Sequence, residues 1–294
     1  MADSGFSRVA PVCAILIALA GASASGLDLG VQAWTGNLGF ATDRTAADTR
    51  FPGSKYFWGL SLYGIQPVTD NFGFETGFYS DPVLRNISYA LFSYTEKLIS
   101  VGVGPLFGFF NDRGTLVKPG MTTSIKLEFP GVVFLSFRSD SSISGELVQD
   151  GDYLQQRNAI SFGFWVPNAI CTLSLDTRRF EQKTDVDRVV DSLTIYSFST
   201  DIYQKNVPYR LIIKFSYQSL AREFITGAAT ATLNSLVLGT EVDVMMSSSL
   251  LFQIGIEGSV YSFGQDTLVG SAGSFLFRTF AGVKVNVDSL PLLR

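Results

Sequence analysis

The sequence contains no histidine, and this limits the chemistry that its other side chains could perform. Without histidine there is no Ser-His-Asp triad, no Cys-His pair and no histidine-ligated metal. The two cysteines, Cys13 and Cys171, are too few for a zinc site or an iron–sulfur cluster. We therefore expect no catalytic residue, no metal site, no cofactor and no enzymatic activity.

The ionisable side chains that are present follow a regular spacing. Eleven of them occupy every second position of otherwise apolar segments, on the side opposite the apolar residues. They are Glu75, Lys126, Glu128, Arg138, Arg210, Lys214, Glu241, Asp243, Glu257, Arg278 and Lys284. Charges collected on one surface in this way could pair with one another, or they could create a field that acts on ions.

The segments that carry these charges alternate with a period of two, which predicts β-strands. In residues 71–78, Phe72, Phe74 and Phe78 share one side, and Glu75 lies on the other. The same alternation recurs in residues 100–109, 121–129, 209–217, 236–244, 252–260 and 275–285. No charge falls on the apolar side of these segments. Since a Lys or Arg that faces lipid costs about 2–4 kcal/mol, this sorting is typical of a membrane-facing surface.

The polar side of these segments distinguishes a barrel from a soluble sandwich. A sandwich also alternates, but its solvated outer face is usually rich in charge. Here the polar side consists of Gly, Ser and Thr with scattered charges, and only 16% of all residues are charged, against about 25% in soluble domains. At 46% apolar residues the chain is also too apolar for disorder. The net charge of −4 gives no electrostatic case for nucleic acid.

Residues 1–24 have the pattern of a secretory signal peptide. The apolar run 9–20 is followed by small residues, so we expect cleavage after residue 24. The alternative, a membrane anchor, needs about 20 apolar residues. Cleavage removes Cys13 and leaves Cys171 without a partner for an internal disulfide. Residues 25–294 then form a single domain.

The remaining chain predicts an all-β fold, an antiparallel up-and-down transmembrane barrel of about fourteen strands, with a range of 12–16. The expected strands are 26–40, 56–66, 70–80, 83–93, 97–110, 119–129, 131–138, 157–166, 168–176, 188–200, 207–218, 234–246, 250–262 and 274–287. Long loops alternate with short turns. The long loops are expected at 41–55, 111–118, 139–156, 177–187, 219–233 and 263–273.

Three local features stand out from this pattern. Asp81-Pro82 gives a short connection at a position where the alternation calls for a long loop. Pro105 falls inside an expected strand, and because a closed barrel has no free edge, we expect a bulge there. The charged run 176–183 is expected to be the solvated face of a loop.

Alternating segments such as Asn71-Phe72-Gly73-Phe74-Glu75-Thr76-Gly77-Phe78-Tyr79 make the chain resemble the outer-membrane β-barrel proteins of diderm bacteria. In size and strand number it is similar to monomeric porins of about fourteen strands. It is also similar in general character to spirochaete barrels, although no motif carries that likeness. The resemblance implies an outer-membrane location with both termini in the periplasm. The chain departs from the pattern at its end, where residues 288–294 contain no aromatic residue.

The resemblance and the lumen pattern together predict a channel for the passive diffusion of small hydrophilic solutes. The eleven charged residues are the expected lumen lining, and with Asp28 they comprise six positive and six negative charges, which predicts weak ion selectivity. Two alternatives remain open: a carrier of hydrophobic substrates, although the chain lacks the N-terminal hatch of such carriers, and a surface adhesin displayed on a barrel. The expected partners are outer-membrane lipid, small solutes and the barrel-assembly machinery, and the expected state is a monomer.

Overall fold

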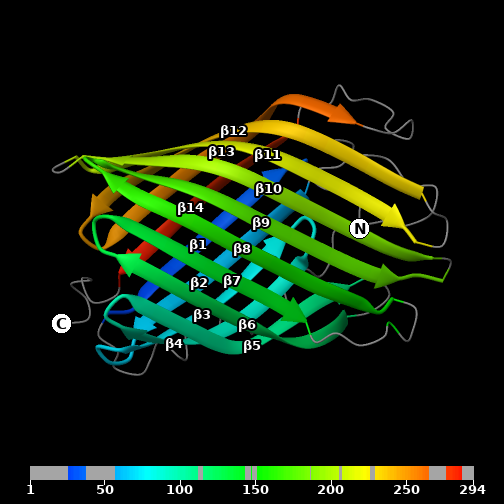
Figure 1. The fold of residues 1–294 in the computed structure, drawn as a ribbon, viewed down its shortest axis with the longest axis horizontal. Helices are drawn as coiled ribbons and strands as arrows, with labels where there is room; N and C mark the ends of the chain where they lie inside the picture. Colours follow the sequence, from blue (N-terminus) through cyan, green and yellow to red (C-terminus); the bar gives the residue numbers. More distant parts are fainter. Residues whose placement is uncertain are drawn as a thin grey trace.

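A computed structural model shows that the chain forms a closed, antiparallel barrel of fourteen strands (Figure 1). It describes residues 26–37, 57–111, 115–142, 147, 151–185, 187–204, 207–225, 229–264 and 276–286. The predicted signal peptide, residues 1–24, and the tail 288–294 lie outside these ranges. Within them, no helix is long and apolar enough to cross a membrane.

Each strand pairs with its neighbours in sequence order, and β14 closes the barrel against β1. The strands are β1 (Asp28–Gly36), β2 (Phe57–Pro67), β3 (Phe72–Asp81), β4 (Arg85–Glu96), β5 (Ile99–Asn111), β6 (Thr115–Phe129), β7 (Val133–Ser142), β8 (Tyr153–Val166), β9 (Ala169–Lys183), β10 (Arg188–Tyr203), β11 (Tyr209–Phe224), β12 (Ala229–Ser247), β13 (Leu250–Gly264) and β14 (Phe277–Asn286). The fold class and all fourteen expected strands are confirmed.

The two rims of the barrel differ in their connections. One rim, which we call the turn rim, carries the start of β1, the end of β14 and the six connections β2–β3, β4–β5, β6–β7, β8–β9, β10–β11 and β12–β13. The opposite rim, the loop rim, carries the remaining connections. The expected short connection at Asp81-Pro82 is confirmed, because only residues 82–84 join β3 to β4 at the loop rim.

Several of the expected long loops are wrong, because the strands continue into them. β9 extends to Lys183 and β11 to Phe224, so most of the expected loops 177–187 and 219–233 is strand. The run 176–183 is therefore not a solvated loop face. The outward apolar residues that mark a strand in the sequence stop before the hydrogen-bonded ladder does, and this hid the extra length.

The bulge expected at Pro105 is also wrong. The β4–β5 register is the same on both sides of this residue, with Tyr89 opposite Leu106 and Phe92 opposite Val103. The ladder omits two residue pairs there and inserts no extra residue. Proline lacks the N–H that a ladder needs, and the wall tolerates it by leaving a local gap in the pairing.

The two faces of the wall have opposite character. On β5, Val101, Val103 and Phe107 point outward and stay 45%, 53% and 43% exposed, whereas Leu106 points inward and is fully buried. The same division holds around the barrel, so a continuous band of exposed apolar side chains covers the outside. A band of this kind is stable only against another apolar phase.

Candidate functional site

The β3–β4 turn, residues 82–84, lies inside the barrel. β3 leaves its neighbour β2 after the pair Tyr79–Ser61, and the strand end and turn then contact strands on the far wall. Asp81 pairs with Arg178 of β9, which is six strands away around the barrel. Side chains can bridge that separation only if the tip of the hairpin bends into the lumen.

Apolar side chains surround the turn and fill the interior near the loop rim. Their shared feature is burial on the inner side of the wall, at 0–8% exposure. This loop-end core consists of Val83, Tyr153, Phe180, Leu193, Ile195, Leu220, Leu233 and Leu276. Tyr153 and Phe180 stack with ring centroids 5.7 Å apart, and the Tyr153 hydroxyl donates to the Gly108 carbonyl at 2.7 Å. The barrel is therefore packed across its interior at this level.

Asp81 organises the turn and fastens it to the wall. Its Oδ1 accepts hydrogen bonds from the backbone N–H groups of Val83 and Leu84, both at 2.8 Å. This is the local capping that aspartate provides in short turns. Its Oδ2 pairs with the guanidinium of Arg178. On the other side of the turn, the Gln155 side chain donates to the Leu84 carbonyl.

A second ion pair fastens the hairpin at the start of β4. Arg222 of β11 donates to both carboxylate oxygens of Asp191 on β10, at 2.7 and 3.0 Å. Both side chains are only 1% exposed. Arg85 approaches the same carboxylate at 3.5 Å and donates to the Pro82 carbonyl at 2.8 Å. Such a buried pair is costly to break, because either partner alone would be an uncompensated charge.

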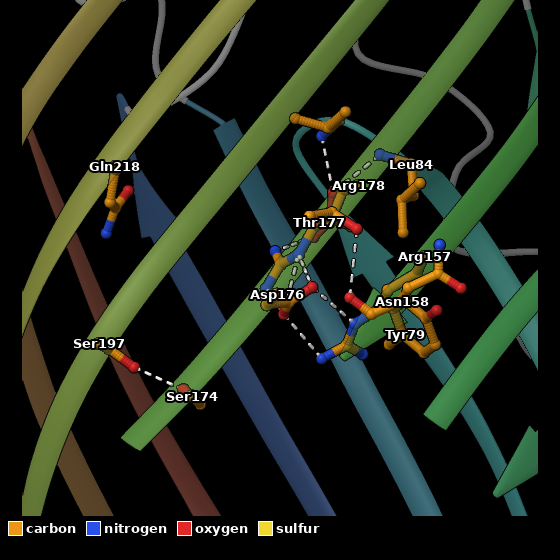
Figure 2. Close-up of polar contacts among 12 residues, drawn as sticks. Tyr79, Leu84, Arg157, Asn158, Ser174, Asp176, Thr177, Arg178, Ser197 and Gln218 are labelled. Atoms are coloured by element: carbon orange, nitrogen blue, oxygen red, sulfur yellow. Dashed lines mark hydrogen bonds and ion pairs between the residues drawn. The ribbon is translucent and has the colours of Figure 1, made fainter. Parts of the chain in front are cut away.

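Two arginines on the wall share one carboxylate below the turn. Arg157 of β8 donates to Asp176 at 3.2 and 3.0 Å, and Arg178 donates to the same carboxylate at 2.7 Å through Nη2. Figure 2 shows the guanidinium groups of Arg157 and Arg178 converging on Asp176, with Leu84 of the turn nearby. Arg178 thus has two carboxylate partners, Asp176 on the wall and Asp81 beside the turn.

The middle of the lumen holds a network that links β3 and β4 to β7. Arg138 pairs with Glu75 and Asp140, each at 3.1 Å. The Tyr89 hydroxyl donates to Glu75 at 2.6 Å, and the Tyr79 hydroxyl donates to Asp140 at 3.2 Å. Arg138 also stacks over the Tyr89 ring at 4.2 Å. These contacts hold the β3–β4 hairpin to β7.

The wall formed by β11–β14 carries a separate row of pairs. Lys214 reaches Glu257 at 3.1 Å across the intervening strand β12, and Arg278 reaches the same carboxylate at 2.6 Å. Gly239 lies between Lys214 and Glu257 in the ladder. A Cβ at Gly239 would come within 3.0 Å of the Glu257 side chain, so glycine leaves room for this contact.

Nearer the turn rim, the cationic side chains are more open to solvent, whereas Asp201, Asp243 and Gln253 stay buried. Arg210, 44% exposed, pairs with Asp201 and stands 3.8 Å from Asp243. The amide of Gln253 donates to Glu241 and to Asp243, at 3.0 Å each. Lys126, 47% exposed, pairs with Glu128. The lumen is therefore polar at this end, with Arg210 and Lys126 as its most exposed charges in these pairs.

All eleven charged residues predicted from the sequence lie at inward positions of their strands. The structure brings most of them into three groups: the Arg138 network with Glu75, the Lys214–Glu257–Arg278 row, and the cluster around Arg210 with Glu241 and Asp243. Lys126 and Glu128 form a pair of their own, and Lys284 of β14 lies near Glu241 of the third group. Among the described residues, no three His, Cys, Asp or Glu side chains gather as a metal site.

The sequence prediction missed the charged residues closest to the turn. They are Asp81, Arg85, Asp140, Arg157, Asp176, Arg178, Asp191 and Arg222. The prediction also missed Asp201, the partner of Arg210 near the turn rim. A usable signal existed for some of them. Arg222 keeps the every-second-residue spacing of Arg210 and Lys214, and Asp140 follows Arg138 by two positions.

Comparisons with known proteins give structural similarity only. No protein-family model and no curated protein matches the chain. Among solved structures, an outer-membrane channel of Pseudomonas putida F1 matches with 11% identity and a TM-score of 0.45, covering 90% of this chain and 96% of that chain. The outer-membrane protein OmpT of Vibrio cholerae matches with 10% identity and a TM-score of 0.43, covering 90% and 98%. The CymD monoaromatic hydrocarbon channel matches with 8% identity and a TM-score of 0.45, covering 90% and 89%.

Proposed function

We propose that this chain is an outer-membrane channel for small hydrophilic solutes, held closed at its loop rim by the β3–β4 turn. The observation that carries the proposal is the closed barrel with an apolar exterior and a lumen crossed by paired charges. A polar interior is the usual interior of a barrel that conducts water-soluble solutes. The eleven charged residues line this path, together with the arginines and carboxylates around the turn.

The orientation and the environment follow from the same features. The signal peptide directs the export of the chain. The turn rim, which carries the start of β1 and the end of β14, faces the periplasm, and the loop rim faces the outside of the cell. The barrel inserts as a monomer in contact with outer-membrane lipid, and the barrel-assembly machinery folds it. Recovery of the chain in the outer-membrane fraction, with an N-terminus at Ser25, tests the export and the location.

The small size of the closing element supports a gated channel over a permanently filled barrel. Only the three residues 82–84 connect β3 and β4, and side chains, not a separate domain, hold them in place within the described residues. Val83 and Leu84, at 1% and 0% exposure, are the apolar anchors of this turn.

Conductance in planar bilayers tests the proposal with the full-length protein purified from membranes. Discrete, ohmic steps are expected, rare for the unmodified protein and frequent for the double variant V83G/L84G, which lacks the apolar anchors. Sugar entry in liposome swelling should show the same order. The proposal is abandoned if both proteins are folded and inserted, and neither passes current or sugar.

A carrier of hydrophobic substrates is the second candidate, and the loop-end core favours it. An apolar interior at one rim could accept a hydrophobic molecule if its side chains move apart. Vesicles that contain the protein would then take up a fluorescent fatty acid faster than empty vesicles, while ion conductance stayed at the background level.

A further inference from the structure

The carboxylate of Asp81 occupies a position on the lumen wall that a free anion could also fill. Its Oδ2 is bound by Arg178, and its Oδ1 is bound by the turn's own backbone. The wall side of this contact is built by β8 and β9, far from Asp81 in the sequence. Arg178, the fixed half of the contact, therefore belongs to the barrel wall, whereas Asp81, the other half, lies at the start of a short turn.

Among the direct ion pairs of the fixed half, two guanidinium groups share one carboxylate when Asp81 is left out. Arg157 and Arg178 carry two positive charges, and they share the single carboxylate of Asp176 (Figure 2). The pair Arg222–Asp191 is already balanced within the wall. Withdrawal of the turn would thus remove one of the two ion pairs that Arg178 makes among the described residues, and leave it to share Asp176 with Arg157.

We propose that Arg178, supported by Arg157 and Asp176, is a binding site for small carboxylate solutes, and that Asp81 is its tethered occupant. This inference rests on the proposed channel function. The planar guanidinium binds a carboxylate with two parallel donors, which gives both strength and geometric selectivity. The Arg178 and Arg157 side chains are 13% and 27% exposed, so the site borders the accessible lumen.

Binding and opening are coupled in this arrangement. A carboxylate solute that replaces Asp81 on Arg178 removes the turn's ionic contact with β9, but it leaves the Asp81 cap on Val83 and Leu84 intact. Since a ligand favours the conformation that binds it, carboxylate solutes shift the turn toward its released position. Asp81 competes at the high local concentration of a tethered group, so the unmodified protein binds such solutes weakly.

The variant D81N separates the two roles of Asp81. The amide oxygen can still accept the two backbone hydrogen bonds, but the charge that competes for Arg178 is gone. Equilibrium dialysis of the purified full-length protein with radiolabelled succinate is expected to show binding that is tighter for D81N than for the unmodified protein by about tenfold or more. D81S, whose hydroxyl can also cap the turn, is expected to behave in the same way.

Two further variants decide whether Arg178 is the site. The double variant D81N/R178Q is expected to lose succinate binding. R179Q is the matched control, because Arg179 is the next residue on β9, points outward at 55% exposure and pairs with Glu181. In the D81N background it should leave succinate binding unchanged.

The outcomes separate this inference from the proposed function. The inference is overturned if D81N and D81S, both folded, bind succinate no better than the unmodified protein, or if D81N/R178Q binds as well as D81N. Binding with the expected order but without any conductance in bilayers would retain the site and reject the channel. Conductance without succinate binding would retain the channel and reject the site.

Discussion

Two arginine–aspartate pairs on the same two strands, β10 and β11, experience opposite environments. Near the loop rim, Arg222 and Asp191 are each 1% exposed and meet at 2.7 Å. Near the turn rim, Arg210 and Asp201 are 44% and 12% exposed. The chemistry is identical, so the difference comes from what surrounds each pair: a packed apolar interior at one end and a polar lumen at the other.

This difference implies that the two ends contribute to stability in different ways. An exposed pair is worth about 0–1 kcal/mol, because water competes for both charges. Removal of one partner from a buried pair costs about 3–5 kcal/mol, since the remaining charge stays desolvated. The loop end behaves as the core of a small protein would, whereas the turn end behaves as a surface.

The largest expected effect comes from removing the loop-end arginine. R222M should lower the free energy of unfolding by about 3–5 kcal/mol, because Asp191 is left buried without its main partner. R210M, the matched change on the same strand, should lower it by less than R222M does, because Arg210 is 44% exposed even though its partner Asp201 is 12% exposed. Urea unfolding of the refolded barrel, followed by tryptophan fluorescence, measures both. Equal losses for the two variants would show that the ends are equally solvated.

Aliphatic side chains sharpen the same comparison. L193A removes a side chain of the loop-end core that is 2% exposed, and it should lower the free energy of unfolding by about 2–5 kcal/mol. Ile65 also points inward, opposite Asp28 and Glu75 near the turn rim, but it is 42% exposed. I65A should cost only about 1 kcal/mol, because it leaves no closed cavity. A larger loss of unfolding free energy for I65A than for L193A would contradict the placement of the packed core near the loop rim.

The smallest effect is expected at the turn rim. E128Q removes the ionic partner of Lys126, yet Lys126 keeps its position over the Phe134 ring at 5.7 Å. The free energy of unfolding should fall by less than about 1 kcal/mol, and the difference should vanish in high salt. Denaturant midpoints at low and high ionic strength test this, and a large, salt-independent loss would contradict it.

The sequence was sufficient to predict the barrel, its strand number and the inward position of the eleven charged residues. The every-second-residue pattern of residues such as Phe72, Phe74 and Glu75 reports which face meets lipid. It could not report the loop-end core. Leu193 and Phe180 are apolar residues that point inward, which reverses the rule on which the prediction relied.

The sequence pattern was equally unable to predict that the β3–β4 turn bends into the lumen. The short Asp81-Pro82 connection is visible as a break in the loop alternation, but its inward bend depends on Arg178, Asp191 and Arg222, which the sequence pattern assigned to loops or left unassigned. Contacts between strands six positions apart depend on tertiary geometry, which alternation does not encode.

The unequal strand lengths give the molecule an uneven profile above the membrane. β12 has 19 residues and β14 has 10. At the rise and tilt usual for barrel strands, the wall at β12 is roughly 20 Å higher than at β14. In the proposed orientation that extra height projects outside the cell. An antibody or a phage that approaches this side would therefore find the tall, hydrogen-bonded wall around β12, a rigid epitope, beside the lower wall at β14.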